Sequence, residues 1–446
     1  MVSLHREENF VIIELGSHTT KAMQDVTDVN KLPTVHIRSR AGIAKPDEAP
    51  EPSNASQTDA EPKGSTMSVD GSTEAQSEPA QGADDAPKAN STDSSNDQDT
   101  NGPNYLFGSA LASADADTID STVDIIANGF VNDWDALSAF LRHIMTKELG
   151  IRITDNTSAL LFSIPALWPK SDLENLTQIA FEDLNAPTIM VIEQPLLAAY
   201  GNNGVTGIVI DMGHDTTTIT PVIDSAVQNS SIAQTTAAGA AVTQRLQALL
   251  QADTETRKQF ADERVPIEFT IALKESGLCK LQLPNADSAD ERLSFEFGEK
   301  PYTICSDALA RAPEILVQPA QTSEQPLTTL IRQAVLGCDT DKRAALWENM
   351  HLVGGSSQFP GLRERLQFEL ESTVLPASNI FALSQTRDTR FCSLPEYFVG
   401  WRNHAHWAAF VGACLVAKIA LTDSRHFVSR AEYNDNGPSV IHTKSF

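Results

Sequence analysis

The chain has 446 residues, a hydrophobic fraction of 41% and a formal net charge of −26. This length is sufficient for two or more domains with sizeable cores, and the negative charge excludes electrostatic gripping of nucleic acid by the chain alone. The five cysteines are scattered without a CxxC pair, which excludes a recognisable zinc or disulfide framework and fits a reducing compartment. No secretory signal is expected, and the longest apolar run, residues 407–421, contains Lys418 and predicts a buried helix instead of a membrane span.

One pattern occurs twice in the chain. Residues 10–21 read FVIIELGSHTTK and residues 207–221 read GIVIDMGHDTTTITP, and the two align without a gap, with Glu14 on Asp211 and Gly16 on Gly213. Each copy predicts a buried strand, a tight glycine turn and a second strand. The repeat predicts two similar halves, each presenting one turn to a shared cleft.

Such turns suit phosphate binding. A glycine permits close backbone approach, and successive N–H groups and hydroxyls can then surround phosphate oxygens. An acid at the end of the first strand can hold a magnesium ion through its waters. A single copy is more often an ordinary hairpin, but a matched pair favours a site, and Lys21 is expected to point back towards it.

Residues 31–43 predict one more strand pair. Residues 44–102 contain no Ile, Leu, Phe, Trp, Tyr or Cys and hold ten of the 26 net negative charges. A segment of this composition cannot bury enough apolar surface to offset the entropy of ordering it. We predict a disordered acidic insertion, either regulatory or simply tolerated.

Beyond the insertion, strands and helices alternate, which indicates an α/β domain. Order is expected to resume at Tyr105, and residues 130–149 predict a helix capped by Asn132 or Asp133. Strands are predicted at 158–164 and 189–191. Between them a capping box, Ser171 to Glu174, is expected to open a helix, and a further helix starts at residue 193 and carries Gln194.

The chain after the central hairpin shows a second glycine-rich turn. A helix is predicted from residue 237, followed by a polar helical region over 253–300 with Lys274 and Glu275 near its middle. Residues 347–358 predict a strand that ends at Gly354 and Gly355, with a helix from Gly361. Strand–glycine–helix turns are common in plain α/β packing, so this signal is weak by itself.

The order of these features resembles actin and the actin-related proteins. The most specific match is the C-terminal segment 427–446, FVSRAEYNDNGPSVIHTKSF, and the resemblance covers residues 9–43 and 103–446. The phrases EYF…W and WEN…VGGSS look most like the fungal nuclear class, the ninth actin-related class. The resemblance implies an α/β fold with two RNase H-like halves and four subdomains around a central cleft.

The expected organisation follows from this resemblance. Residues 1–43 begin the first half, the insertion 44–102 interrupts it, and residues 103–193 complete it. Residues 194–400 form the second half, and residues 401–446 return to the first. The insertion falls in the small outer subdomain, where actin carries its polymer-forming loop, so a filament-forming role is disfavoured.

The resemblance also implies roles for individual residues. Gly16, Ser17 and Lys21 fall on the first phosphate loop, Asp211 and Gly213 on the second. Gln194 falls on the glutamine that orients the attacking water. The residues that fall near ribose and adenine are Gly239, Lys274, Glu275, Gly354, Gly355 and Ser356.

Several positions depart from the family pattern. Glu14 is one methylene longer than the aspartate expected at the metal, and His214 and Asp215 replace an acid–glycine pair. Thr218 stands where a histidine helps to place water, and Ile271 replaces an arginine. Phosphoryl transfer depends on positioned metal and water, so we expect very weak or absent ATP hydrolysis, with no catalytic residue and no metal ligand assigned. ATP with Mg²⁺ is the one cofactor considered, and the sequence leaves its binding open.

The resulting expectation is a non-catalytic nuclear scaffold subunit of a SWI/SNF- or RSC-type chromatin remodelling complex. Its expected partners are a long helix of the remodeller's ATPase subunit and a second actin-related protein, with no direct nucleic-acid or membrane binding. An apolar groove that holds the helix is predicted from Tyr200, Val205, Thr422 and Phe427. The alternative is a weakly hydrolysing, nucleotide-switched ATPase. Which remodeller is joined, and what the insertion does, are left open.

Overall fold

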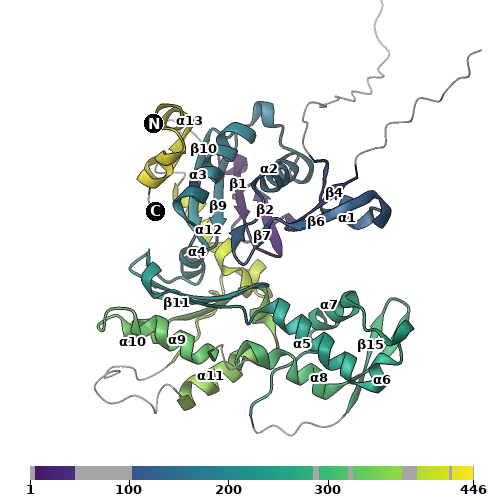
Figure 1. Cartoon of the computed structure of the whole chain (residues 1–446). Coiled ribbons are helices and arrows are strands. Elements are labelled where there is room, and N and C mark those ends of the chain that lie inside the picture. Colours follow the sequence, from purple (N-terminus) through teal and green to yellow (C-terminus); the bar gives the residue numbers. More distant parts are fainter. Residues whose placement is uncertain are drawn as a thin grey trace, which may run out of the picture.

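Two α/β bodies, one above the other in Figure 1, make up the chain. The computed structural model describes residues 6–45, 103–284, 291–319, 325–373, 389–420 and 424–444. Residues 46–102 of the predicted insertion, and Thr422 of the predicted groove, lie outside the described residues. Among the described residues, no helix combines the length and the apolar character required to cross a bilayer.

A six-stranded sheet, in the order β18-β10-β9-β1-β2-β3, organises the first half. Its strands are β1 Phe10–Glu14, β2 Thr19–Gln24, β3 Val35–Arg38, β9 Ala159–Ile164, β10 Thr188–Glu193 and β18 Val428–Ser429. Every residue of β1 and β9 is buried, as expected of central strands with both faces covered. Strands β1 and β2 form the predicted first hairpin, with Glu14 opposite Lys21.

Helices cover this sheet. Helix α2, Trp134–His143, is capped by Asp133, whose side chain accepts from the Ala136 N–H, and a π-helical turn, Ile144–Glu148, continues it. Helix α3 is Lys170–Gln178, and a π-helical turn, Ile179–Asp183, follows it. Near the C-terminus, helix α13, Arg430–Asn436, is followed by a 3-10 segment, Pro438–Thr443.

The predicted capping box at Ser171 is wrong. Helix α3 starts two residues earlier than expected, with Pro169 in place of Ser171 as its N-cap, so Ser171 already lies inside the helix and its hydroxyl donates to Asp172. The capping box in the structure opens α13 instead, between Ser429 and Glu432.

A smaller sheet projects from the first half. It contains β4 Arg40–Ala44, β5 Tyr105–Leu106 and β6 Ile119–Asp124, with helix α1 Gly108–Ser113 and the short hairpin of β7 Ile126–Ala127 and β8 Phe130–Val131. The predicted strand pair at 31–43 is therefore corrected. Both strands form, but β3 joins the six-stranded sheet and β4 pairs with β5 and β6.

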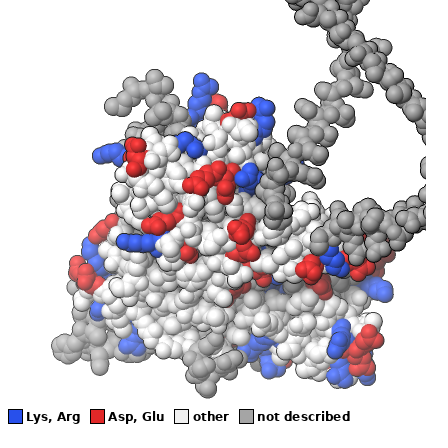
Figure 2. All heavy atoms as spheres, turned by 45° about the horizontal axis from the view of Figure 1, so that its top comes forward, with Lys and Arg blue, Asp and Glu red and all other residues white. Residues whose placement is uncertain are grey.

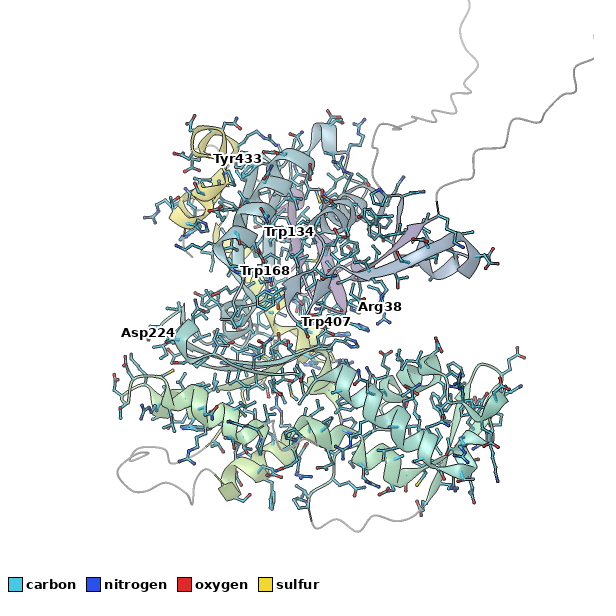
Figure 3. The ribbon with its side chains drawn as sticks, in the orientation of Figure 1. Arg38, Trp134, Trp168, Asp224, Trp407 and Tyr433 are labelled. Atoms are coloured by element: carbon cyan, nitrogen blue, oxygen red, sulfur yellow. The ribbon has the colours of Figure 1, made fainter. Side chains whose placement is uncertain are left out.

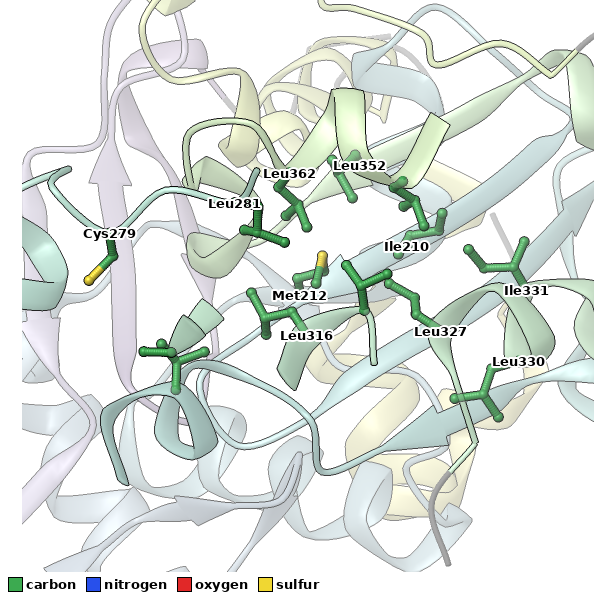
Figure 4. Packing of buried hydrophobic residues seen from close by; sticks show 14 of the residues in the cluster. Ile210, Met212, Cys279, Leu281, Leu316, Leu327, Leu330, Ile331, Leu352 and Leu362 are labelled. Carbon is green, nitrogen blue, oxygen red and sulfur yellow. The ribbon is translucent and has the colours of Figure 1, made fainter. Parts of the chain in front are cut away.

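The second half is built on a five-stranded sheet, β13-β12-β11-β17 with β14 on β12. Its strands are β11 Gly207–Met212, β12 Thr217–Ile223, β13 Ala226–Val227, β14 Ala233–Thr235 and β17 Met350–Val353. The helices of this half are α5 Gly239–Ala252, α6 Thr254–Arg257, α7 Ile267–Glu275, α8 Ser306–Arg311, α9 Leu327–Leu336, α10 Arg343–Glu348 and α11 Leu362–Thr373. Figure 4 shows side chains from sheet and helices meeting in its core, among them Met212, Leu316 and Leu362.

The prediction of a helical region over 253–300 is wrong in its last part. Strand β15, Arg292–Phe297, pairs there with β16, Lys300–Cys305. Along β15, exposed and half-buried residues alternate strictly, with Leu293, Phe295 and Phe297 packed against the core. This period of two is the ordinary strand signal.

Two helices join the halves. Helix α4, Gln194–Gly201, and helix α12, Ala408–Ala420, cross at the base of the cleft, so closely that a Cβ on Gly412 would lie 1.8 Å from the Leu197 carbonyl oxygen. The cluster around them mixes residues of both sheets, including Phe10 and Ile12 from one and Val209 and Val353 from the other. Beyond α12 the chain returns to the first half, where β18 pairs with β10.

Candidate functional site in the central cleft

A cavity of about 700 Å³ lies where the β1–β2 turn faces the β11–β12 turn. Arg38 and Trp407 mark the boundary between the two halves in Figure 3. The structure brings together on its wall the predicted site residues Gly16, Ser17, Lys21, Gln194, Asp211, Gly213, Lys274, Glu275, Gly354, Gly355 and Ser356. The remaining one, Gly239, lies behind the second turn and donates its N–H to the Gly213 carbonyl.

The first turn is tight, and its charges are satisfied internally. A Cβ on Gly16 would lie 2.6 Å from the Thr19 carbonyl oxygen, which explains the glycine. Lys21 forms an ion pair with Glu14, and each residue is only 8% exposed. Glu14 Oε2 has no hydrogen-bond partner among the residues described. Lys21 Nζ also lies 5.4 Å from the centre of the Trp407 ring, so this lysine belongs to an internal cluster.

The second turn is anchored from three sides. Gly213 donates its N–H to the Thr216 carbonyl, and its own carbonyl accepts from the Gly239 N–H and from Ser356 Oγ. Gly354 has a φ of +85°, and a Cβ there would lie 2.3 Å from Asp211 Oδ1. This glycine is therefore required for packing against Asp211. Burial and the nearby Glu14 raise the pKa of Asp211 to about 6, and Lys21 partly offsets them.

The Gln194 side chain is hydrogen-bonded to the first turn. Its Nε2 donates to the Leu15 carbonyl at 2.6 Å and lies 3.4 Å from the Ser163 carbonyl. Thr218 lies opposite Asp211 in the β11–β12 register. Thr218 therefore occupies the position at which the resemblance implied a histidine that helps to place water.

A pair of histidines bridges the two turns. The ring of His18 from the first turn lies against that of His214 from the second, with centroids 4.3 Å apart and planes tilted by 37°. Beside them, Asn128 of the β7–β8 turn donates its N–H to Asp215 Oδ2 at 3.0 Å. The sequence analysis missed His18. The signal was available in the sequence, because each of the two turns expected to hold phosphate contains a bulky histidine.

The residues between the turns do not fit a magnesium triphosphate. The His18 and His214 rings are in contact between the two turns, and the Lys21 ammonium is already paired with Glu14. A phosphate chain placed between these two turns would require the rings to separate.

Histidines are concentrated in this cavity, since five of the chain's ten histidines line it. His404 stacks on Trp407 with ring centroids 4.6 Å apart, and His406 and His36 also pack against that tryptophan. Burial, with the nearby Lys21, lowers the pKa of His406 to about 3. The sequence analysis did not connect these residues to the cleft, because they come from segments far apart in the chain.

The residues of the predicted partner groove lie in unlike environments. Val205 is 54% exposed, and Tyr200 is half-buried against the cluster that joins the halves. Phe427 is only 3% exposed and packs edge-on against Phe10, with ring centroids 6.0 Å apart. Its predicted position as an open groove wall is therefore corrected, because Phe427 is a core residue that precedes β18.

The fold and the paired turns are those of a known class of protein. The family model named Actin matches residues 5–446, so this chain belongs to the actin family. It is 27% identical over 346 residues to "Actin-related protein 7" of Arabidopsis thaliana, covering 73% of this chain and 86% of that protein. It is 27% identical over 324 residues to "Actin-like protein 9" of Rattus norvegicus, covering 71% of this chain and 72% of that protein. These matches confirm the predicted fold and the resemblance to actin-related proteins.

Proposed function

We propose that the chain is a non-catalytic actin-related subunit of a nuclear, ATP-dependent chromatin remodelling complex of the SWI/SNF or RSC type. The observation that carries the non-catalytic part is the histidine pair between the two turns, with rings 4.3 Å apart. The remodelling part rests on the C-terminal segment and the two phrases that resemble the fungal nuclear class. The nuclear location follows from that same resemblance.

The groups around the cleft support a structural role. Phosphoryl transfer requires a positioned metal, a positioned water and stabilisation of the developing charge. Glu14 is paired with Lys21, and the Gln194 amide is committed to the Leu15 carbonyl. Each of these groups stabilises the protein's own architecture instead of a reacting phosphate.

The proposed partners are a long helix of the remodeller's ATPase subunit and a second actin-related protein. An amphipathic helix binds by placing apolar residues from successive turns into a groove. Val205, exposed in the loop between α4 and β11, is the accessible apolar residue among the described members of the predicted set. Tyr200 lies on α4 close to the α4–α12 crossing and supports this location.

Co-purification with the ATPase helix tests this proposal. We expect Val205→Asp to reduce retention of the helix at least tenfold, because it places a carboxylate on the docking face. Ile267→Asp is the matched control, since Ile267 is 39% exposed on α7 in the second half. Equal retention of the helix by the two variants would exclude the surface around Val205 as its binding site. Phe427→Asp is unsuitable because it places a charge in the core.

A second candidate function is a nucleotide-switched ATPase. The observation in its favour is the cavity of about 700 Å³, whose wall includes Gly355 with no atom near its Cβ position. Saturable stabilisation by ATP and Mg²⁺ in a thermal unfolding assay, with stoichiometric ADP in the denatured protein, would favour this candidate over the first.

A further inference from the structure

The two halves are joined by more than the crossing of helices α4 and α12. The β11–β12 turn of the second half contacts two turns of the first half, through His214 on His18 and through Asp215 on the Asn128 N–H. Four residues from three turns therefore connect the halves in addition to the helical crossing.

We propose that these four residues form a latch that holds the cleft closed without a nucleotide, and that protonation of the two histidines opens it. The proposal deepens the non-catalytic function proposed above, because a latch made of side chains removes the need for a bound ligand between the turns. It also makes ring contact and triphosphate binding mutually exclusive.

The charges around the ring pair favour neutral imidazoles. Arg38 Nη1, from β3, lies 3.2 Å from His18 Nδ1, which can accept a hydrogen bond only when that nitrogen carries no proton. Lys274 of α7 and His36 of β3 also act on the pair. The carboxylates that face it are Asp215, which accepts from Asn128, and Asp124, which is bound to Arg40. Two imidazolium rings in contact, beside Arg38 and Lys274, would repel each other.

The direction of the pH effect follows. Burial, with His214, Arg38, Lys274 and His36, lowers the pKa of His18 from 6.5 to about 3, and burial followed by Lys274 lowers that of His214. In an open cleft both rings would titrate nearer their ordinary value. The ratio of closed to open cleft is therefore highest above pH 6.5 and decreases as the pH falls towards 3. At pH 5.5 the ratio of closed to open cleft should fall about tenfold through His18 alone.

Amide hydrogen exchange of the full-length chain tests the latch. The probes are the Asn128 amide and the two turns, 15–19 and 213–216. At pH 7.5 we expect His18→Ala with His214→Ala to raise exchange at these sites at least tenfold, with the α4–α12 crossing unchanged. His442→Ala is the matched control, since His442 pairs with Glu174 on the first half, away from the cleft. Unchanged exchange at the probes in the double variant would overturn the proposal.

Acidification supplies an independent test. When the pH falls from 7.5 to 5.5, amide exchange at the wild-type probes should become faster, after correction for the intrinsic pH dependence of amide exchange. A chain with His18→Phe and His214→Phe keeps two rings in contact that cannot take up a proton, so amide exchange at its probes should not become faster. Equal opening of the wild-type and phenylalanine chains would exclude a histidine switch. This comparison stands even where the alanine variant fails to fold.

The latch and the proposed function can fail separately. ATP turnover by the wild-type chain would overturn the non-catalytic function. Loss of pH-dependent opening, with helix binding intact, would overturn the latch alone. Thermal stabilisation by ATP and Mg²⁺ should be absent in the wild-type chain and gained when both histidines become alanine; binding to the wild-type chain with both rings still in contact would also overturn the latch.

Discussion

Three charged side chains lie together beneath the turns of the cleft. Glu14 and Lys21 form a buried ion pair, and burial together with the nearby Glu14 carboxylate raises the pKa of Asp211 to about 6. Lys21 is the cation that lowers this pKa, so one ammonium offsets two acids. The resemblance to actin implied that Lys21 lies on a phosphate loop, whereas in the structure this lysine is paired with Glu14.

Removal of Lys21 should therefore be costly. Lys21→Met leaves Glu14 buried without its partner, and breaking a buried ion pair from one side typically costs about 3–5 kcal/mol. We expect a loss of that size in urea unfolding at pH 7.5. Glu14→Gln combined with Lys21→Met should recover most of it, because both charges are then gone. A double variant as unstable as the single one would show that packing, and not charge, explains the effect.

His406 should contribute to acid sensitivity of the fold. Burial and Lys21 lower its pKa to about 3. Below about pH 6.5, His406 is therefore protonated in the unfolded chain but stays neutral in the folded chain. Stability attributable to this group therefore falls as the pH falls from 6.5 towards 3. Asp211, with its raised pKa, acts in the opposite direction between about pH 6 and 3.8.

Urea unfolding at pH 7.5 and pH 5.5 measures this effect. His406→Gln cannot titrate, so this variant should lose less stability on acidification than the wild-type chain does. An identical pH dependence in the wild-type and His406→Gln chains would contradict the assignment to His406.

At the scale of elements, the α4–α12 crossing depends on small residues. Gly412 and Gly201 let the helices approach until backbone meets backbone, and a Cβ on Gly201 would lie 2.1 Å from the Ala408 carbonyl oxygen. A backbone carbonyl inside a helix cannot move aside as a flexible side chain can. The crossing is therefore a closely packed contact between the two helices that join the halves.

Gly412→Ala separates two opposing effects. Helix propensity favours alanine by about 1 kcal/mol, whereas overpacking in a core costs about 1–3 kcal/mol. Because the clash is with backbone, at 1.8 Å from Leu197, we expect net destabilisation in urea unfolding. Gly355→Ala, where a Cβ meets nothing within 4 Å, is the control and should stay near the wild-type value. A stabilised Gly412→Ala chain would show that the helices are less closely packed than described.

At the scale of the whole molecule, the described residues on either side of the acidic insertion lie next to each other. The Ala44 N–H donates to the Asn104 carbonyl, and Ile43 pairs with Tyr105 in the small sheet. A linker that replaces residues 46–102 therefore has only a short distance to span. On the face of the folded part shown in Figure 2, acidic and basic side chains are interspersed, without a large patch of one sign.

Replacement of residues 46–102 by a short Gly-Ser linker should leave the fold intact. The entropy of loop closure changes by only about 0.6 kcal/mol for each halving of loop length, and shortening favours the folded state. We expect an unfolding midpoint in urea that is equal to or slightly above that of the full chain. A control deletion extended to residue 106 removes β5 and should be destabilising. Marked destabilisation by the first deletion would indicate that the insertion packs on the folded part.

The sequence by itself was sufficient for the family, through the resemblance of its motifs to actin, and for the paired turns and most strands and helices. The turns, strands and helices depend on local signals: apolar runs with period two or 3.6, glycines where no Cβ fits, and a helix cap such as Asp133. Local signals failed at β15, where a strand replaced the expected helix, and at Ser171, where the helix starts two residues earlier than expected.

Only the tertiary structure decided which side chains meet across the molecule. The contact of His18 with His214, the commitment of Gln194 to Leu15 and the burial of Phe427 against Phe10 each join segments far apart in the chain. Such contacts depend on how closely two halves approach and on which groups then lose their water, and no local pattern encodes either quantity. The family could therefore be predicted from the resemblance of the motifs to actin, whereas the contact between the two turns became visible only in the tertiary structure.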